Sequence, residues 1–442
     1  MEMVHKMGTF PDTPRMTHAA APWEYSQGGT RRSLAKESHR RFADHLRLVF
    51  AGALIALEFT NLFGFVTFLA ISNPQTKRFA LNFSPYALQF LGYGICLVVV
   101  ALDRESLRRL VKQPIFRWVF VAIIVFAWSM LLRAMNPPAG LEDYFFERPF
   151  GLRINALAFM LSSVLIFSGE NVLDFAKRAV AFATLLAIVV NLYEVAYPGT
   201  FSVDPGRSAG LYVNPNECGV AIVFGCVTGL TALPRRWREL FLIATGMGVV
   251  ATFSREAMIA FLIVVVGASI GRAVSWPRLV FMIAATGVLF MTLGVWTSLT
   301  DNGVLNADDL DRLTSASDAS AKSRYRLAKM VLEKFEEAPL LGNGFETAGY
   351  WAHNESHNLY FSFLADHGIF GILLIPGLVL SLFRRTWDYY AFAGAFMLWC
   401  FFDHNLFSDS FALIVLAIQA NERVVARNYA TREPYVLRER KA

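Results

Sequence analysis

The segment from Ile115 to Ala134 reads IFRWVFVAIIVFAWSMLLRA, and it decides the fold of this chain. A run of about 20 predominantly apolar residues has the length that an α-helix needs to cross the hydrocarbon core of a bilayer. The overall composition agrees, because 55% of the 442 residues are hydrophobic and only 17% are charged. Soluble proteins carry about 25% charged residues. The sequence therefore predicts an all-α polytopic membrane protein.

Similar runs recur along the whole chain. Apolar runs of about 17 to 25 residues, the length range of transmembrane helices, occur about twelve times. We therefore expect about twelve transmembrane helices in a domain at 47–421, with a loosely ordered cytoplasmic tail at 1–46 and a basic cytoplasmic tail at 422–442. The expected spans lie near 48–72, 84–102, 115–134, 152–169, 177–197, 216–233, 238–253, 256–273, 278–299, 365–383, 387–403 and 408–421.

The positions of Lys and Arg predict the orientation of these spans. Basic residues are enriched in the short cytoplasmic loops of membrane proteins, and a cytoplasmic N-terminus puts most basic residues of this chain on that side. Both termini are then cytoplasmic. Topology and anionic lipid headgroups explain the net charge of +6, so we expect no nucleic-acid partner. The cytoplasmic basic residues include Arg31, Arg32, Lys36, Arg40, Arg41, Arg104, Arg108, Arg109, Lys112, Arg235, Arg236, Arg238, Arg272, Arg384, Arg385 and the tail from Arg423 to Lys441.

The longest segment on the opposite, outward side is 300–357. It opens with acidic residues and continues at 323–335 with apolar residues that share one helical face. Pro and Gly in the stretch APLLGNGF at 338–345 then end this helix. We expect an amphipathic helix that lies on the membrane surface. Its apolar face consists of Ala328, Val331, Leu332 and Phe335.

Histidines cluster after this helix, and a metal site, a catalytic base and ordinary packing are the competing explanations. His353 and His357 have the spacing of two ligands on one helix face. However, Glu355 comes one residue too late for the base of a zinc-protease motif, and His367 lies about 15 Å further along a helix axis. We therefore expect no metal and no other cofactor. For His353 and His367 we expect packing at the membrane interface, with headgroups and water as partners.

Two outward arginines set His357 apart from the other histidines. Arg207 precedes Asn214 and Asn216, either of which can cap a helix. Arg255 lies in a tight turn between two expected spans, where interfacial snorkelling is the alternative explanation. Guanidinium groups bind phosphate bidentately, and a neutral imidazole accepts a hydroxyl proton near pH 7. The three residues together suit a lipid-linked anionic substrate.

From about residue 205 to residue 371 the chain resembles the O-antigen ligase and polymerase superfamily of bacterial envelope glycosyltransferases. The most specific feature is His357-Asn358, which nine residues separate from Gly368-Ile-Phe-Gly371. This is similar to the family's His-Asn-x9-Gly-x-x-Gly signature, in which we interpret Gly368 and Gly371 as close-packing positions. The Arg207 segment and Ser254-Arg255 also resemble family motifs. One departure is that eleven residues, rather than the usual ten, separate Arg207 from Gly219.

The resemblance implies a multi-span glycosyltransferase of the C type (GT-C) at the periplasmic face of the bacterial inner membrane, surrounded by membrane lipids. It implies that neither a nucleotide sugar nor a metal is needed, because the donor is a glycan on undecaprenyl pyrophosphate. His357 would deprotonate or orient the acceptor hydroxyl, and Arg207 and Arg255 would bind the pyrophosphate. A solvated helix face is an equal explanation for Arg324 and Arg326. The further candidates for substrate binding are Asn358, His353, Arg324, Arg326, Asn214 and Asn216.

Within the superfamily we expect an O-antigen ligase that joins the glycan to a lipid A-core sugar. The outward segment that carries Arg207 is only about 18 residues long, whereas polymerases often have a large loop there. A polymerase of O-antigen or exopolysaccharide and a protein-glycosylating relative are the alternatives within the superfamily. A secondary transporter is the alternative from another class. It is disfavoured because few charged residues lie inside the expected spans, where a coupled transporter needs them.

Overall fold

The computed structural model describes residues 27–72, 87–135, 137, 147–198, 200–202, 207–281, 283–284, 319–351, 357–403 and 406–439. Every regular element in these ranges is a helix, so the prediction of an all-α protein is confirmed. The helices are α1 (Gln27–Leu54), η1 (Ile55–Phe59, a π-helical turn), α2 (Leu62–Ser72), α4 (Ala87–Leu102), α5 (Arg104–Val111), α6 (Pro114–Met135), α7 (Glu147–Ile166), α8 (Glu170–Ala196), η2 (Gly210–Tyr212, a 3-10 turn), α9 (Pro215–Leu230), α10 (Arg235–Ala251), α11 (Arg255–Ile270), α14 (Ala319–Glu337), α15 (Thr347–Trp351), α16 (Leu359–His367), α17 (Ile369–Ile372), α18 (Leu374–Ser381), α19 (Trp387–Phe402) and α20 (Ser410–Glu439).

Helices lie at the expected spans wherever the chain is described, although most of 278–299 falls outside the described residues. Three helical segments are long and apolar enough to cross a membrane on their own, and one pair of helices, bent by 45°, passes the same test together. The chain therefore has the helices of a membrane protein, whereas the total of twelve spans stays a prediction. The three segments are Pro114–Met135, Pro149–Ile166 and Glu170–Ala196, and the bent pair is Glu37–Phe59 with Leu62–Leu69.

The expected span at 365–383 is broken into α16, α17 and α18. Gly368 separates the first two with a φ of +66°, a conformation that residues with a side chain rarely adopt. A Cβ on Gly368 would lie 2.3 Å from the carbonyl oxygen of Leu340, and a Cβ on Gly371 would lie 2.0 Å from that of Phe363. Both glycines are therefore close-packing positions, as the sequence predicted.

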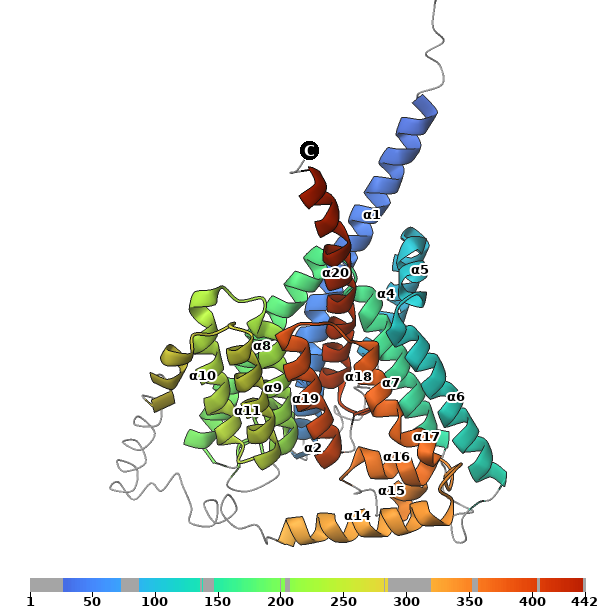
Figure 1. The fold of residues 1–442 in the computed structure, drawn as a ribbon, viewed down its shortest axis with the longest axis vertical. Helices are drawn as coiled ribbons and strands as arrows, with labels where there is room; N and C mark the ends of the chain where they lie inside the picture. The colour runs from blue at the N-terminus through green and yellow to red at the C-terminus, as the bar shows by residue number, and fades with distance from the viewer. Residues whose placement is uncertain are drawn as a thin grey trace, which may run out of the picture.

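The two ends of the described chain lie at the same end of the molecule, where α1 and α20 project beyond the other helices (Figure 1). α1 begins at Gln27, so the expectation of a loosely ordered tail is wrong for residues 27–46, which are helical. α20 continues to Glu439, so the basic tail expected at 422–442 extends the last apolar run as a helix. We call this end of the molecule the α5 end and the opposite one the α14 end.

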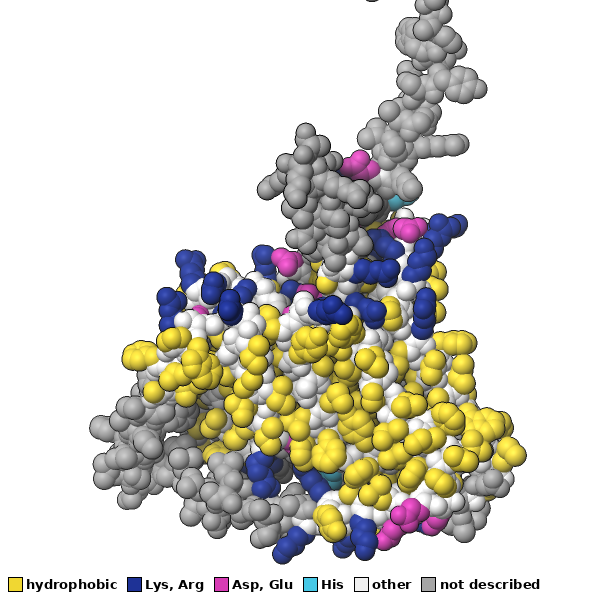
Figure 2. Space-filling model, in the orientation of Figure 1, with side chains coloured by type: hydrophobic (Ala, Val, Ile, Leu, Met, Phe, Trp, Pro, Cys, Tyr) yellow, Lys and Arg dark blue, Asp and Glu magenta, His cyan; other side chains and the backbone are white. Residues whose placement is uncertain are grey.

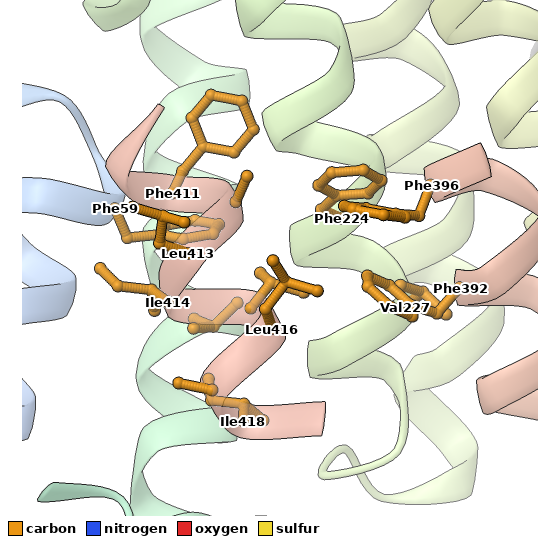
Figure 3. Packing of buried hydrophobic residues seen from close by; sticks show 14 of the residues in the cluster. Phe59, Phe224, Val227, Phe392, Phe396, Phe411, Leu413, Ile414, Leu416 and Ile418 are labelled. Carbon is orange, nitrogen blue, oxygen red and sulfur yellow. The ribbon is translucent and has the colours of Figure 1, made fainter. Parts of the chain in front are cut away.

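α9 lies at the centre of the bundle and contacts α8, α10, α11, α19 and α20. Nearly all of its residues are buried, as expected for a helix that is surrounded on all sides. Figure 3 shows Phe224 and Val227 of α9 facing Phe392 and Phe396 of α19. The ring centroids of Phe224 and Trp399 are 5.4 Å apart. Aromatic packing therefore holds α19 against α9 at the centre of the bundle. The loop that contains Arg207 leads directly into α9.

Hydrophobic side chains cover the middle of the molecule as a broad belt (Figure 2). Lys and Arg gather above this belt at the α5 end, where α5 itself contributes Arg104, Arg108 and Arg109. An apolar belt between two polar ends is the surface that a bilayer requires of a helical bundle. The surface therefore agrees with a membrane protein whose basic residues are concentrated at one end.

α14 confirms the helix expected in the outward segment, and it lies across the direction of the long helices (Figure 1). Val331 is buried, as the predicted apolar face requires, but Leu327, outside that face, is buried as well. Both pack in a small cluster with Ala348 and Ala365. α14 is therefore attached to α15 and α16, which the sequence did not predict. Residues 300–318 lie outside the described part of the chain.

Gly371→Ala is expected to destabilise the protein, because the new Cβ would meet the backbone of Phe363. Overpacking of this kind costs about 1–3 kcal/mol. Gly94→Ala is the matched control, since nothing lies within 4 Å of a Cβ added there and Ala is favoured over Gly inside a helix. Thermal unfolding of the purified protein in detergent measures both variants. Equal melting temperatures would contradict the packing described for Gly371.

Candidate functional site

His357 and Asn358 form the start of α16 at the α14 end of the bundle. Asn358 is buried, and its Oδ1 accepts a hydrogen bond from the backbone N–H of Phe361 at 3.0 Å. This is the geometry of a helix N-cap. His357 directly precedes the cap with a φ of +46°, a left-handed conformation that is uncommon for residues other than glycine. The cap therefore fixes the start of α16 and the position of His357.

The start of α16 is attached to the end of α19. The N–H of Leu359 donates to the carbonyl oxygen of Asp403 at 3.1 Å, and Asp403 Oδ2 accepts a hydrogen bond from the indole of Trp399 at 3.2 Å. α19 packs along α9 and α11. The start of α16 is therefore bound to a helix that packs on α9, which follows the Arg207 loop, and on α11, which begins with Arg255.

Arg207 is held between α9 and the end of α10. Its Nε donates to the carbonyl oxygen of Thr252 at 3.0 Å, and its Nη2 donates to Asn216 Oδ1 at 2.6 Å. Asn214 caps α9, because its Oδ1 accepts from the N–H of Asn216 at 2.9 Å. Asn214 and Asn216 therefore both orient Arg207, one through the helix start and the other directly. Their role as substrate ligands stays a prediction.

Arg255 is the first residue of α11, and its side chain is exposed. Ser254 caps this helix, with Oγ accepting from the N–H of Ala257 at 3.4 Å. α11 and α9 approach closely here, because a Cβ on Gly219 would lie 2.6 Å from Cβ of Ala257. The turn that carries Arg255 therefore lies next to the start of α9, where Arg207 is bound.

Glu256 connects α14 to this turn. Its Oε2 lies 3.0 Å from Arg324 Nη1, and the glutamate side chain is 7% exposed against 30% for the arginine. α14 also packs on α16, the helix that His357 precedes. The Glu256–Arg324 pair therefore connects the Arg255 turn to the helix that packs beside the His357 segment, and Arg324, one of the predicted residues, is part of this connection.

The structure distinguishes the remaining candidates. Arg326 is exposed on α14, and His353 lies outside the described residues. His367 does pack, but the expectation of headgroup and water partners is wrong because the ring is buried. Its Nδ1 lies 2.7 Å from Ser129 Oγ, and its ring centroid is 5.3 Å from that of Phe126.

In the part of the chain that the structure describes, no group of three or more His, Cys, Asp or Glu side chains could hold a metal ion.

Three acidic residues that the sequence analysis did not propose as site residues hold these positions: Glu194 and Glu256 through their carboxylates, and Asp403 through its backbone carbonyl oxygen. Glu194 accepts four backbone hydrogen bonds from the loop around Arg207. Each carboxylate lies at the end of an apolar helix and is buried. Burying an ionised group costs several kcal/mol unless it finds partners. An acidic residue at the end of an apolar run is therefore the signal by which the sequence could have identified them.

Arg324→Ala is expected to destabilise the attachment of α14, because it removes the ion-pair partner of buried Glu256. With Arg324 partly exposed, we expect a loss of about 1–2 kcal/mol. Limited proteolysis of α14 and the melting temperature of the protein measure the effect, and Glu256→Gln in the same chain should restore much of the loss. Arg326→Ala, on the exposed face of the same helix, is the control. Equal losses for the two arginines would exclude a specific role for the Arg324–Glu256 pair.

The chain was compared with protein families, curated proteins and solved structures. A family model described as O-antigen ligase matches residues 240–375. The comparisons with curated proteins and with solved structures gave no match. The matched segment contains Arg255, Arg324 and His357, whereas Arg207 precedes it. Over residues 240–375, the match confirms the resemblance found in the sequence motifs to the O-antigen ligase superfamily.

Proposed function

We propose that the chain is an O-antigen ligase. It transfers a polysaccharide from undecaprenyl pyrophosphate to a sugar of the lipid A core, without a metal, at the periplasmic face of the bacterial inner membrane. The observation that carries the proposal is that Arg207 is bound beside the Arg255–Glu256 turn and that Glu256 pairs with Arg324 of α14, the helix that packs on α16 behind His357. The O-antigen ligase domain at 240–375 supports the same reaction class.

His357 and the arginines divide the chemistry between them. The His357 imidazole takes the proton of the acceptor hydroxyl, whose oxygen attacks the anomeric carbon of the donor sugar. The bond between that carbon and the pyrophosphate oxygen breaks, and the electron pair leaves with undecaprenyl pyrophosphate. Arg207 and Arg255 neutralise the charge that develops on this leaving group, which is the largest contribution expected of a preorganised site. Guanidinium groups suit this task because they stay charged and bind phosphate oxygens in pairs.

The proposed location follows from the distribution of charge. The α5 end is basic (Figure 2), so the positive-inside rule assigns it to the cytoplasm together with both termini. The α14 end, with His357 and the arginines, then faces the periplasm. We propose a GT-C transferase domain with about twelve spans at 47–421, flanked by the cytoplasmic segments 1–46 and 422–442. The outward segment at 300–357 belongs to the transferase domain.

A ligase is favoured over a polymerase by the short connection between α8 and α9. Only residues 197–214 separate these two helices, and residues on both sides of Arg207 in this connection donate hydrogen bonds to Glu194. A polymerase binds growing chains as both donor and acceptor, for which a large loop at this place is typical of the family. The short connection leaves α14 as the outward surface that we propose for the lipid A-core acceptor.

His357→Ala is expected to reduce the rate of glycan transfer by about 10²–10⁴-fold, the usual contribution of a general base. The melting temperature should change little, because the cap of α16 comes from Asn358. His45→Ala, which removes an exposed histidine of α1, is the control and should retain full activity. Transfer is followed with purified protein, undecaprenyl-pyrophosphate glycan and lipid A-core. Near-normal transfer by the His357 variant would contradict the proposed mechanism.

The requirement for an acceptor separates ligase from polymerase. We expect product only when lipid A-core is added to purified protein and undecaprenyl-pyrophosphate glycan, because a ligase needs a hydroxyl on the core sugar. Gel electrophoresis of the lipid-linked and lipid A-linked products measures this. Lengthened lipid-linked chains without lipid A-core would instead identify a polymerase. No transfer in either mixture would reject the enzyme proposal.

A further inference from the structure

Glu194, in the last turn of α8, binds the loop that carries Arg207. The carboxylate is almost completely buried, with 1% of the side chain exposed. Each of its two oxygens accepts two backbone hydrogen bonds. The four N–H donors belong to residues that lie before and after Arg207 in the chain. Oε1 accepts from the N–H groups of Phe201 (2.7 Å) and Ser202 (2.5 Å), and Oε2 accepts from those of Ala209 (2.7 Å) and Gly210 (2.9 Å).

This arrangement makes the Glu194 carboxylate the organising centre of the loop. Hydrogen bonds to an ionised acceptor are roughly twice as strong as those between neutral groups. Four of them supply the compensation that a buried carboxylate needs. The carboxylate also supplies an acceptor for four backbone N–H groups, of which those of Ala209 and Gly210 are buried and those of Phe201 and Ser202 are partly buried. The path of the chain on both sides of Arg207 therefore depends on one side chain of α8.

The same loop is fitted against α8 and α10. Gly210 has a φ of +52°, and a Cβ added to it would lie 3.2 Å from the backbone nitrogen of Asn191 in α8. The Asn191 Nδ2 donates to the carbonyl oxygen of Gly248 in α10 at 2.8 Å. The N–H of Ser208 donates to the carbonyl oxygen of Ala251, the last residue of α10, at 3.3 Å. The loop that contains Arg207 therefore contacts both α8, through Gly210, and α10, through Ser208.

We propose that Glu194 is a positioning residue for the transfer reaction, acting through Arg207. It holds the loop so that the guanidinium meets the pyrophosphate of the donor, and it does not touch the substrate. A site residue must be held within about 0.5 Å of its productive position. A loop supplies that precision only when its backbone is fixed, and here the carboxylate fixes it. This inference rests on the proposed binding of pyrophosphate by Arg207.

The first test is Glu194→Gln. The amide that replaces the carboxylate has one acceptor oxygen and an NH2 group that cannot accept, so part of the loop loses its acceptor. We expect KM for undecaprenyl-pyrophosphate glycan to rise about tenfold or more, a change of 1.4 kcal/mol per factor of ten. The kcat should fall as well, because Arg207 also neutralises the charge that develops on the leaving group, whereas KM for lipid A-core should change less than about twofold. Hydrogen exchange of the amides at 201–202 and 209–210 should become faster.

A double-mutant cycle shows whether Glu194 acts through Arg207. In an Arg207→Ala background, Glu194→Gln should raise KM for the donor no further, because the guanidinium that it positions is absent. An equal additional rise in that background would overturn the inference. Asp174→Asn, the same chemical change on an exposed carboxylate of α8, is the control for KM and for the melting temperature.

Glu194→Asp covers the case in which the glutamine variant does not fold. It keeps the charge but shortens the side chain by one methylene, so we expect a smaller rise in donor KM, and an unchanged KM would contradict the inference.

Failure of the proposed function would give a different result. If Arg207→Ala leaves the donor KM unchanged, then Arg207 does not bind pyrophosphate. The exchange rates of the loop amides then decide alone whether Glu194 holds the loop.

Discussion

Buried carboxylates that accept backbone N–H groups hold the turns at the α14 end together. Backbone donors cannot stay unpaired in a medium that offers little water, so each turn needs an acceptor from a neighbouring helix. Asp366 supplies one, with Oδ2 accepting from the N–H of Glu346 at 3.0 Å and Oδ1 from that of Ala348 at 2.7 Å. Glu194 does the same for the loop around Arg207. The position of the Arg207 loop and the connection of α15 to α16 depend on these bonds.

The charges at this end are arranged as an alternation of guanidinium and carboxylate groups. Glu256 lies in the field of Arg324, Arg207 and Asp403, so the arginines are already partly compensated before any substrate binds. An anion with two phosphates offers more acceptor oxygens than one carboxylate does, and bidentate pairs to guanidinium groups are strong and directional. Glu256 therefore holds Arg324, while Asn216 and the carbonyl oxygen of Thr252 orient Arg207. In the proposed reaction the arginines bind a more highly charged partner.

Sequence patterns were sufficient for the parts of this structure that depend on local composition. The apolar runs identified the helices, because burial of an apolar segment needs only length and hydrophobicity. Of the helix caps, Asn214 was one of the two residues expected to cap α9, whereas Ser254 and Asn358 were not predicted as caps although both have side chains that commonly cap helices. The glycine spacing after His357 predicted close packing.

The sequence patterns did not predict the contacts between residues that are distant in the sequence. The four bonds of Glu194 depend on how the chain returns to α8 after the loop, and the burial of His367 depends on Ser129, which lies far away in the sequence. Leu327 was missed because α14 packs on α16 as well as presenting the expected face.

The three helices that carry the site begin in the same way. Val213, Phe253 and His357 have φ values of +65°, +49° and +46°, and each directly precedes the capping residue of α9, α11 or α16. A non-glycine residue in this region costs of order 1–3 kcal/mol, and such residues persist where the surroundings determine them strongly. The shared result is a sharp entry into a capped helix. The first turn of a helix carries a partial positive charge that favours anions. In the proposed reaction the three helix starts add to the field of the arginines, which is a reason for the chain to retain this strain three times.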